Sequence, residues 1–171
     1  MEIVTLTRDL AVELCDQLVA LDEAAVREFG SQFATVPWSA QSFCLDRPGK
    51  WVLSSAALEE GVLGALLIMS QPQTDTAHCH RMVVHPSVRG QGVGYRLMAH
   101  SLAAAVASGL RYATLAVAAG NEGAQAFYLR SGFALLTGQA LADYAAAHGL
   151  EVDGDVMLDG DHRLRAMVRS L

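Results

Sequence analysis

The sequence of 171 residues has few cysteines, no long hydrophobic run and a shortage of positive charge. Its three cysteines, Cys15, Cys44 and Cys79, lie far apart and form no C-x-x-C pair, which argues against a zinc site or a disulfide framework. No apolar run reaches the roughly 18 residues that a membrane-spanning helix needs. The N-terminus lacks the basic start and apolar run of a signal peptide. We therefore expect a protein with no membrane partner in a reducing, cytoplasmic setting.

The charge balance is acidic, with 12 Lys and Arg against 18 Asp and Glu and a net charge of −6. Proteins that bind nucleic acid usually present a basic face, so we expect no nucleic-acid partner. A cationic or amine ligand is compatible with this charge, although the charge alone does not indicate one. The length fits one domain of about 100–200 residues, and we expect residues 1–171 to form a single domain.

Apolar periodicity and turn signals predict an α/β domain with a mixed sheet. Leu10, Leu14, Leu18 and Leu21 follow helical spacing, for example. The alanine-, glycine- and aspartate-rich segment 137–161 is assigned no helix or strand. The predicted strands are Glu2–Thr5, Trp51–Leu58, Val62–Ser70, Ala77–His85, Tyr112–Ala118, Phe133–Leu136 and His162–Ser170, and the predicted helices are Asp9–Phe29, Ser39–Leu45, Gly94–Ser108 and Glu122–Arg130.

A glycine-rich turn, RGQGVG at residues 89–94, connects a predicted strand to a predicted helix. Glycines let the backbone pass close to a ligand, and the start of a helix presents unpaired N–H groups and the positive end of its dipole. Together these features suit a pyrophosphate. The alternative is a tight strand-to-helix turn that binds nothing, and the glycines alone do not decide between the two.

Two nucleotide-binding motifs lack their specific residues in this turn. A dinucleotide fold needs a third glycine where Tyr95 stands, and an acidic residue on the next strand. A P-loop needs a lysine followed by serine or threonine, and no lysine is nearby. The turn therefore does not indicate a nucleotide fold of either kind.

The stretch RMVVHPSVRGQGVGYRLM resembles the acetyl-CoA motif of the GNAT superfamily of N-acetyltransferases, through Arg89, Gly92 and Gly94 preceded by Val84 and Pro86. A second block of the superfamily, a strand followed by an asparagine and then AFYLRSGF, is matched by segment 112–133. The resemblance covers nearly the whole chain. It implies a single-domain GNAT fold, with a mixed, mostly antiparallel central sheet that is splayed at the cofactor strand and flanked by helices.

The resemblance also implies the cofactor, acetyl-CoA, and no metal. The backbone of the strand before the turn holds the pantetheine arm like an added strand, and an N–H near Val84 meets the thioester oxygen. Asn121 contacts the cofactor arm, and it also suits a helix cap. The implied cofactor-binding residues are Met82, Val83, Val84, Arg89, Gly90, Gln91, Gly92, Val93, Gly94, Tyr95 and Asn121.

Two residues are candidates for catalysis. Tyr128 matches the usual general acid of the superfamily, although helix spacing alone favours a packed tyrosine. His78 stands where many relatives have a glutamate base, and His80 follows on the same face of the strand. The alternatives are ordinary packing histidines or a water relay without a dedicated base. Cys79 and Arg81 are expected on the opposite face with structural roles.

The acceptor side is less defined. Trp38 and Phe43 fall where the superfamily covers its acceptor, but they also suit a core, and VPWSAQSF is loosely similar to protein N-terminal acetyltransferases. The acidic segment 153–161 either forms plain turns or attracts an amine, and it lacks the glutamate of a calcium loop.

We therefore expect an N-acetyltransferase that moves an acetyl group from acetyl-CoA to a primary amine, of a small molecule or a peptide N-terminus. The transfer is expected to be a direct attack through a tetrahedral intermediate. A non-catalytic acyl-CoA-binding sensor is the alternative function, and a homodimer is left open.

Overall fold

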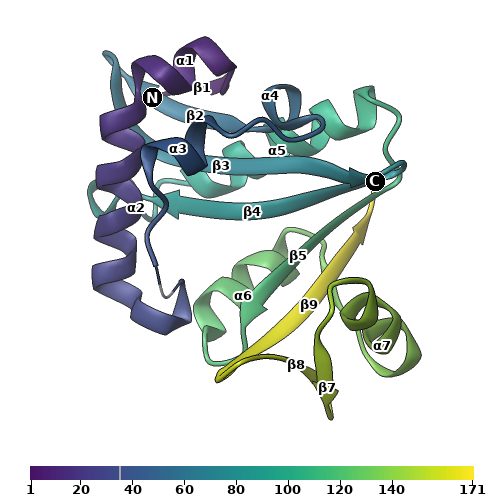
Figure 1. The fold of residues 1–171 in the computed structure, drawn as a ribbon. Helices are drawn as coiled ribbons and strands as arrows, with labels where there is room; N and C mark the ends of the chain where they lie inside the picture. The colour runs from purple at the N-terminus through teal and green to yellow at the C-terminus, as the bar shows by residue number, and fades with distance from the viewer. Residues whose placement is uncertain (35) are drawn as a thin grey trace.

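The computed structural model describes residues 1–34 and 36–171, in which strands of mostly antiparallel pairing form one mixed sheet (Figure 1). The strand order is β1-β2-β3-β4-β5-β9-β8-β7, and β6 also pairs with β9. The expected fold class is confirmed. The strands are β1 (Glu2–Thr5), β2 (Ser55–Glu59), β3 (Val62–Gln73), β4 (Thr76–Val84), β5 (Tyr112–Ala118), β6 (Ala134–Leu135), β7 (Glu151–Asp153), β8 (Val156–Asp159) and β9 (His162–Ser170).

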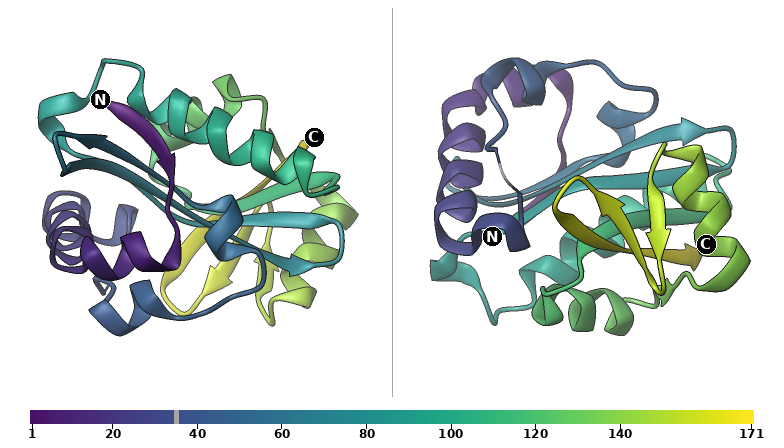
Figure 2. Two further views of the ribbon diagram at one scale, coloured as in Figure 1. Left: turned by 90° about the horizontal axis from the view of Figure 1, so that it is seen from above. Right: turned by 60° about the horizontal axis from the view of Figure 1, so that its bottom comes forward.

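Helices cover both faces of this sheet (Figure 2). A core containing Leu18, Phe43 and Ile68 lies under α1, α2 and α3, and a second core containing Met69 and Leu97 lies under α5. Within residues 1–34 and 36–171, no helix is long and apolar enough to cross a membrane. The helices are α1 (Arg8–Glu13), α2 (Cys15–Phe29), η1 (Gly30–Gln32), α3 (Ala40–Cys44), α4 (Lys50–Leu53), η2 (Pro86–Val88), α5 (Val93–Ala107), α6 (Glu122–Arg130) and α7 (Gly138–Ala147).

The sheet is splayed between its two neighbouring parallel strands, β4 and β5. Their pairing runs from Thr76 opposite Tyr112 to Cys79 opposite Leu115 and then stops. Both strands continue beyond that point and diverge (Figure 1). Among the described strands, the last part of β4 therefore pairs only with β3, and one of its edges is open.

A β-bulge in β4 lies at the point where the splay begins. Ile68 pairs with Arg81 and the next residue of β3 pairs with Cys79, so His80 is an extra residue on β4. A bulge reverses the alternation of faces beyond it. Arg81 therefore faces α2, on the same side as His78, and the prediction that Arg81 lies on the opposite face is wrong. The prediction for Cys79, which faces α5, is confirmed.

Two elements of the first half differ from expectation. The predicted helix Asp9–Phe29 is two helices that meet at Leu14, whose side chain is buried at the junction. The predicted strand Trp51–Leu58 begins as helix α4 and becomes extended only at Ser55. Lys50 is the first residue of α4. Its ammonium group donates to the main-chain oxygens of Phe43 (2.6 Å) and Leu45 (2.7 Å), which ties the start of α4 to the end of α3.

The segment that was assigned no element forms α7, β7 and β8. Leu141 and Ala145, one helical turn apart, are buried and pack against β8 and β9. The predicted strand Phe133–Leu136 is limited to the two residues of β6. The remaining predicted elements are present, with ends shifted by at most a few residues.

Candidate active site

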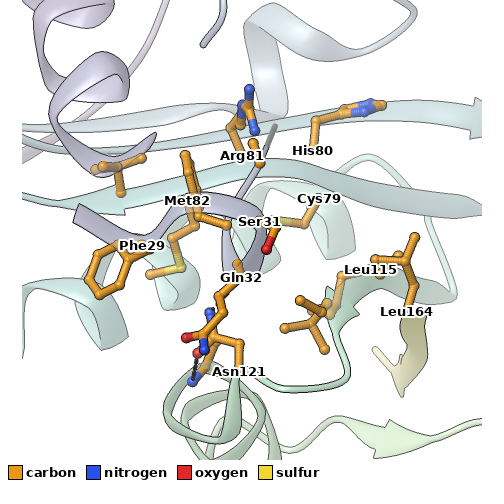
Figure 3. A pocket seen from close by; sticks show the side chains of 18 of the residues that line it. Phe29, Ser31, Gln32, Cys79, His80, Arg81, Met82, Leu115, Asn121 and Leu164 are labelled. Carbon is orange, nitrogen blue, oxygen red and sulfur yellow. Dashed lines mark hydrogen bonds between the residues drawn. The ribbon is translucent and has the colours of Figure 1, made fainter. Parts of the chain in front are cut away.

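A cleft of about 620 Å³ opens where β4 and β5 separate (Figure 3). One wall is β4 from Cys79 to Val84, and the facing wall is β5 together with the start of α6. The end of α2 and the residues that follow it form a third side, and the β8–β9 turn contributes Asp159 and His162. Segments far apart in the sequence therefore meet around one cavity.

The glycine turn lies at one end of the open edge of β4. Gly90 and Gly92 have left-handed backbones, with φ of 76° and 73°, and no described atom lies within 4 Å of a Cβ built on either. The left-handed backbone explains the choice of glycine, because other residues are strained there. Gly92 is the N-cap of α5, a helix of 15 residues whose first N–H groups have no intrahelical partners. Gly94 lies against Met82, where a Cβ would approach the Met82 Cε to 3.2 Å.

Arg89 of this turn is bound to α2. Its guanidinium donates to both carboxylate oxygens of Glu28, at 2.6 and 2.7 Å, and to the main-chain oxygen of Val84 at 2.9 Å. The ring of Phe29 lies 5.1 Å from the guanidinium carbon. The pKa of Glu28 is lowered by the hydrogen bond from Arg89. These contacts fix the turn relative to α2 and leave its backbone N–H groups free for an anion.

Asn121 lies across the cleft from α2. Its Oδ1 accepts from the N–H of Ala124 and so caps α6, at 3.0 Å. Its Nδ2 donates to the main-chain oxygen of Gln32 at 3.0 Å, which links the two walls (Figure 3). The capping role is confirmed, and its contact with a cofactor arm stays a prediction.

Tyr128 on α6 and Cys79 on β4 lie side by side in the cleft wall. Burial, the neighbouring thiol and the hydrogen bond with Cys79 raise the pKa of Tyr128 well above its ordinary value. Burial also raises the pKa of the Cys79 thiol to about 12. Both groups therefore keep their protons at neutral pH.

The two strand histidines occupy different positions. His80 lines the cleft and its Nε2 lies 2.6 Å from the hydroxyl of Ser70, whereas His78 is not among the described lining residues. His78 lies behind it, with its Nδ1 3.0 Å from the Thr114 hydroxyl and ring centres 4.8 Å apart. Burial lowers the pKa of His78 to about 4 and that of His80 to about 3, with Arg47 contributing to both shifts.

Arg81 holds the acceptor side of the cleft together. Its guanidinium lies between the rings of Phe33 and Trp38, donates to the main-chain oxygen of Val36 at 2.9 Å, and lies 3.3 Å from the carboxylate of Asp22. The Asp22 carboxylate also accepts from the N–H of Trp38 at 2.7 Å. Phe43 belongs to the core, and Trp38 packs against that core beside His80.

The open edge of β4 and the glycine turn fit the pantetheine arm and the pyrophosphate of coenzyme A. The open edge of β4 offers main-chain groups to an extended amide arm, and the glycine turn offers N–H groups to a pyrophosphate. The predicted residues Met82, Val83 and Val84 lie on that edge, and residues 89–95 form the turn and the first turn of α5. Among the described residues, no group of three or more His, Cys, Asp or Glu side chains is placed to hold a metal ion.

A splayed sheet with a glycine turn at the start of a helix is the architecture of GNAT folds. The chain belongs to the acetyltransferase (GNAT) family, because the sequence profile of that family matches residues 18–133, more than half of the chain. Members of this family use acetyl-CoA as co-substrate and transfer its acetyl group. A comparison with curated protein sequences gave no significant match.

Solved structures of similar fold include several acetyltransferases. A ribosomal-protein-alanine N-acetyltransferase from Escherichia coli is 20% identical, with a TM-score of 0.69 over 99% of this chain and 92% of that one. Ard1 from Thermoplasma volcanium is 16% identical, with a TM-score of 0.71 over 99% and 97%. PaiA N-acetyltransferase from Thermoplasma acidophilum, in complex with coenzyme A, is 15% identical, with a TM-score of 0.70 over 99% and 98%. At these identities the likeness establishes the fold.

Sequence reasoning missed several residues of the cleft. Gln32, in the turn after α2, lines the cleft, and Glu28 of α2 pairs with the cleft residue Arg89; no motif marks either. Arg81 was placed on the wrong face because the bulge leaves no clear pattern in the sequence. The one signal in the sequence is that Arg81 stands within an otherwise apolar strand end. A buried charge needs a partner, so such an arginine indicates a buried ion pair.

Proposed function

We propose that this protein is an N-acetyltransferase that moves the acetyl group of acetyl-CoA directly to a primary amine, of a small molecule or a peptide N-terminus. The observation that carries the proposal is the convergence of Tyr128, the open edge of β4 and His80 on one cleft. Acetyl-CoA supplies an acetyl group already activated as a thioester. The chain therefore has to orient it, remove protons from the amine and protonate the departing sulfur.

Tyr128 is the proposed proton donor to that sulfur. Its raised pKa keeps the hydroxyl protonated at neutral pH, and the hydroxyl lies beside a sulfur atom, that of Cys79. Transfer through Cys79 itself is disfavoured, because a thiol with a pKa of about 12 is not ionised and cannot act as the nucleophile. Direct attack by the amine is the simpler route.

His80 is the group we propose to face the amine, with His78 behind it. The sequence favoured His78, and that assignment remains a prediction, but His80 is the histidine that lines the cleft. The cations that act on His80, Arg47 and Lys50, also disfavour an ammonium ion nearby. An amine that binds there is therefore driven to lose its proton.

The acceptor enters between the loop after α2 and the β8–β9 turn. Val36 is 68% exposed beside the cleft, and Asp159 supplies a carboxylate on the other side. A negative group at the entrance attracts an amine in its ammonium form. One structure of the same fold is named as the N-acetyltransferase of a ribosomal-protein alanine, which supports a peptide acceptor.

A thiol-release assay tests the proposal. The protein is mixed with acetyl-CoA and, separately, amino acids, polyamines, aminoglycosides and short peptides, and the acetylated product is identified by mass spectrometry. We expect release of coenzyme A with at least one class and roughly 10³-fold slower release by Tyr128→Phe. Tight binding of acetyl-CoA without release across the whole panel would instead establish the sensor function.

A further inference from the structure

Three histidine rings form a line that leads away from the cleft. His80 lines the cleft, and its ring centre lies 4.8 Å from that of His78. The His78 ring centre lies 6.1 Å from that of His148, an exposed residue just after the end of α7. The His80 and His78 rings are in edge-to-face contact, and the His78 and His148 rings are neighbours at a wider separation.

The line connects two cavities. A second cavity of about 200 Å³ is lined by His148, Tyr144 and Thr114. His78 is hydrogen-bonded to Thr114 of this cavity and is in ring contact with His80 of the cleft. The rings of Tyr144 and His148 are stacked, with centres 4.2 Å apart, which holds His148 toward the strand. The three histidines thus extend from the cleft to an exposed surface.

The hydrogen bonds assign the proton on two of the rings. The Nδ1 of His148 lies 2.7 Å from the main-chain oxygen of Tyr144, which only accepts, so this nitrogen carries the proton. The Thr114 hydroxyl donates to the main-chain oxygen of Ala77, so it accepts from the Nδ1 of His78. The Nε2 atoms of His78 and His148 therefore carry no proton, and the Nε2 of His80 lies 2.6 Å from the Ser70 hydroxyl.

Burial and nearby charges prevent the inner rings from keeping a proton. Burial is the largest cause of the lowered pKa of both rings. His148 and Arg47 add to the shift in the pKa of His78, and His78, Arg47 and Lys50 add to that of His80. With pKa values of about 4 and 3, neither ring stays protonated at neutral pH. A proton that reaches either ring must move on, and the exposed His148 is the member of the line in contact with solvent.

We propose that His80, His78 and His148 form a relay that carries the proton of the incoming ammonium group from the cleft to solvent at the end of α7. The proposal rests on the proposed N-acetyltransferase function. In the balanced reaction, R–NH₃⁺ and the acetyl thioester give the acetamide, the free thiol and one H⁺. One of the two protons lost by nitrogen is matched by the proton that Tyr128 gives to sulfur, and the relay removes the other. His80 touches the amine, and His78 and His148 act through it.

The test is His148→Ala, because this exposed side chain is the easiest member to remove without unfolding. With saturating acetyl-CoA and amine in weak buffer, we expect kcat to fall roughly fivefold to tenfold at pH 6.5–7. The deficit should disappear toward pH 9.5, where more of the amine arrives neutral. Added imidazole should restore the low-pH rate of the variant and leave the unsubstituted protein unchanged. His100→Ala, in the middle of α5 where the ring contacts the Thr5 hydroxyl and does not line the cleft, is the matched control and should behave like the unsubstituted protein.

Two further readouts separate a relay from a packing role. Histidine ¹⁵N spectra of the free protein at pH 7 should show the Nδ1–H tautomer for His78 and His148, and the other tautomer in either ring would overturn the relay. An unchanged kcat in His148→Ala, or a loss that is equal at every pH and insensitive to imidazole, would overturn it too. Absence of thiol release by the unsubstituted protein with every amine would overturn the proposed function itself, and with it the relay.

Discussion

The two sides of the cleft are built in different ways. The donor side consists of the end of β4, the glycine turn, the start of α5 and the start of α6, which follow one another within about 50 residues. It offers main-chain groups to the proposed acetyl-CoA, with a left-handed Gly92 and an open strand edge. The acceptor side is assembled from the end of α2, the bulge in β4 and the β8–β9 turn, and it depends on side chains.

The two strand histidines and the buried ion pair fall on one side of this division. His78 and His80, whose pKa values are lowered to about 4 and 3, face the acceptor side, as does the buried ion pair of Arg81 and Asp22. Donor-side contacts, such as Arg89 with Glu28, are at the surface, where charges are well solvated. In the proposed mechanism the donor side is thus a backbone cradle, and the acceptor side is where protons are transferred.

The largest predicted effect belongs to Tyr128, which stands where the two sides meet. Tyr128→Phe should lower kcat by roughly 10³-fold, because the departing sulfur loses its proton donor. The KM for acetyl-CoA should change less than about twofold, since the cradle is untouched. Steady-state kinetics measures both. Tyr112→Phe, at the first residue of β5, is the control for removal of a tyrosine hydroxyl. An equal fall in kcat in that variant would remove Tyr128 from the mechanism.

The next effect separates the two strand histidines. His80→Gln should lower kcat/KM for the amine roughly 100-fold, because this ring lines the cleft, and His78→Gln roughly tenfold, because it acts through its neighbour. Neither should change the affinity for acetyl-CoA, which calorimetry can measure. If His78→Gln has the larger effect and alters the rate–pH profile more, the base predicted from the sequence is correct and our geometric choice is wrong.

A smaller effect tests the donor cradle alone. Gly92→Val forces a β-branched residue into a left-handed backbone, and Gly109→Val does the same at the far end of α5, where φ is 77°. Each should cost about 1–3 kcal/mol of stability, which thermal unfolding measures. Only Gly92→Val should raise the KM for acetyl-CoA, about tenfold. A similar rise in Gly109→Val would mean that strain, and not the anion site, governs binding.

The donor side of the cleft could be predicted from the sequence better than the acceptor side. The turn at residues 89–94 and the Asn121 cap depend on local patterns that the sequence shows, whereas the open strand edge is implied by the family resemblance. The face of Arg81 could not be predicted, because one extra residue in β4 reverses the alternation and pairing with β3 decides its position. A bulge is a property of two strands, and one strand's sequence does not reveal it.

The position of His148 beside His78 could not be predicted either, because it also depends on contacts between distant segments. Helix α7 carries Leu141 and Ala145 on one face, a weak helical signal in a segment rich in small residues. Even a correct helix would not have shown that its end lies 6.1 Å from His78, because that proximity depends on β9 lying between β5 and β8. Contacts of this kind come from topology, which short motifs do not encode.

The smallest predicted effect is on stability and again distinguishes the two sides. A histidine whose folded pKa lies below 6.5 is neutral in the fold, whereas the unfolded chain takes up a proton as the pH falls through 6.5. His78 and His80 therefore contribute full stability above pH 6.5 and lose it as the pH falls toward 4. Between pH 6.5 and 5 each should cost about 1–2 kcal/mol, and denaturant unfolding at several pH values measures the slope. The double variant His78→Gln/His80→Gln should flatten that slope, whereas Gly92→Val should lower stability equally at every pH. An unchanged slope in the double variant would show that the acceptor histidines titrate normally and that the division of charge between the two sides is wrong.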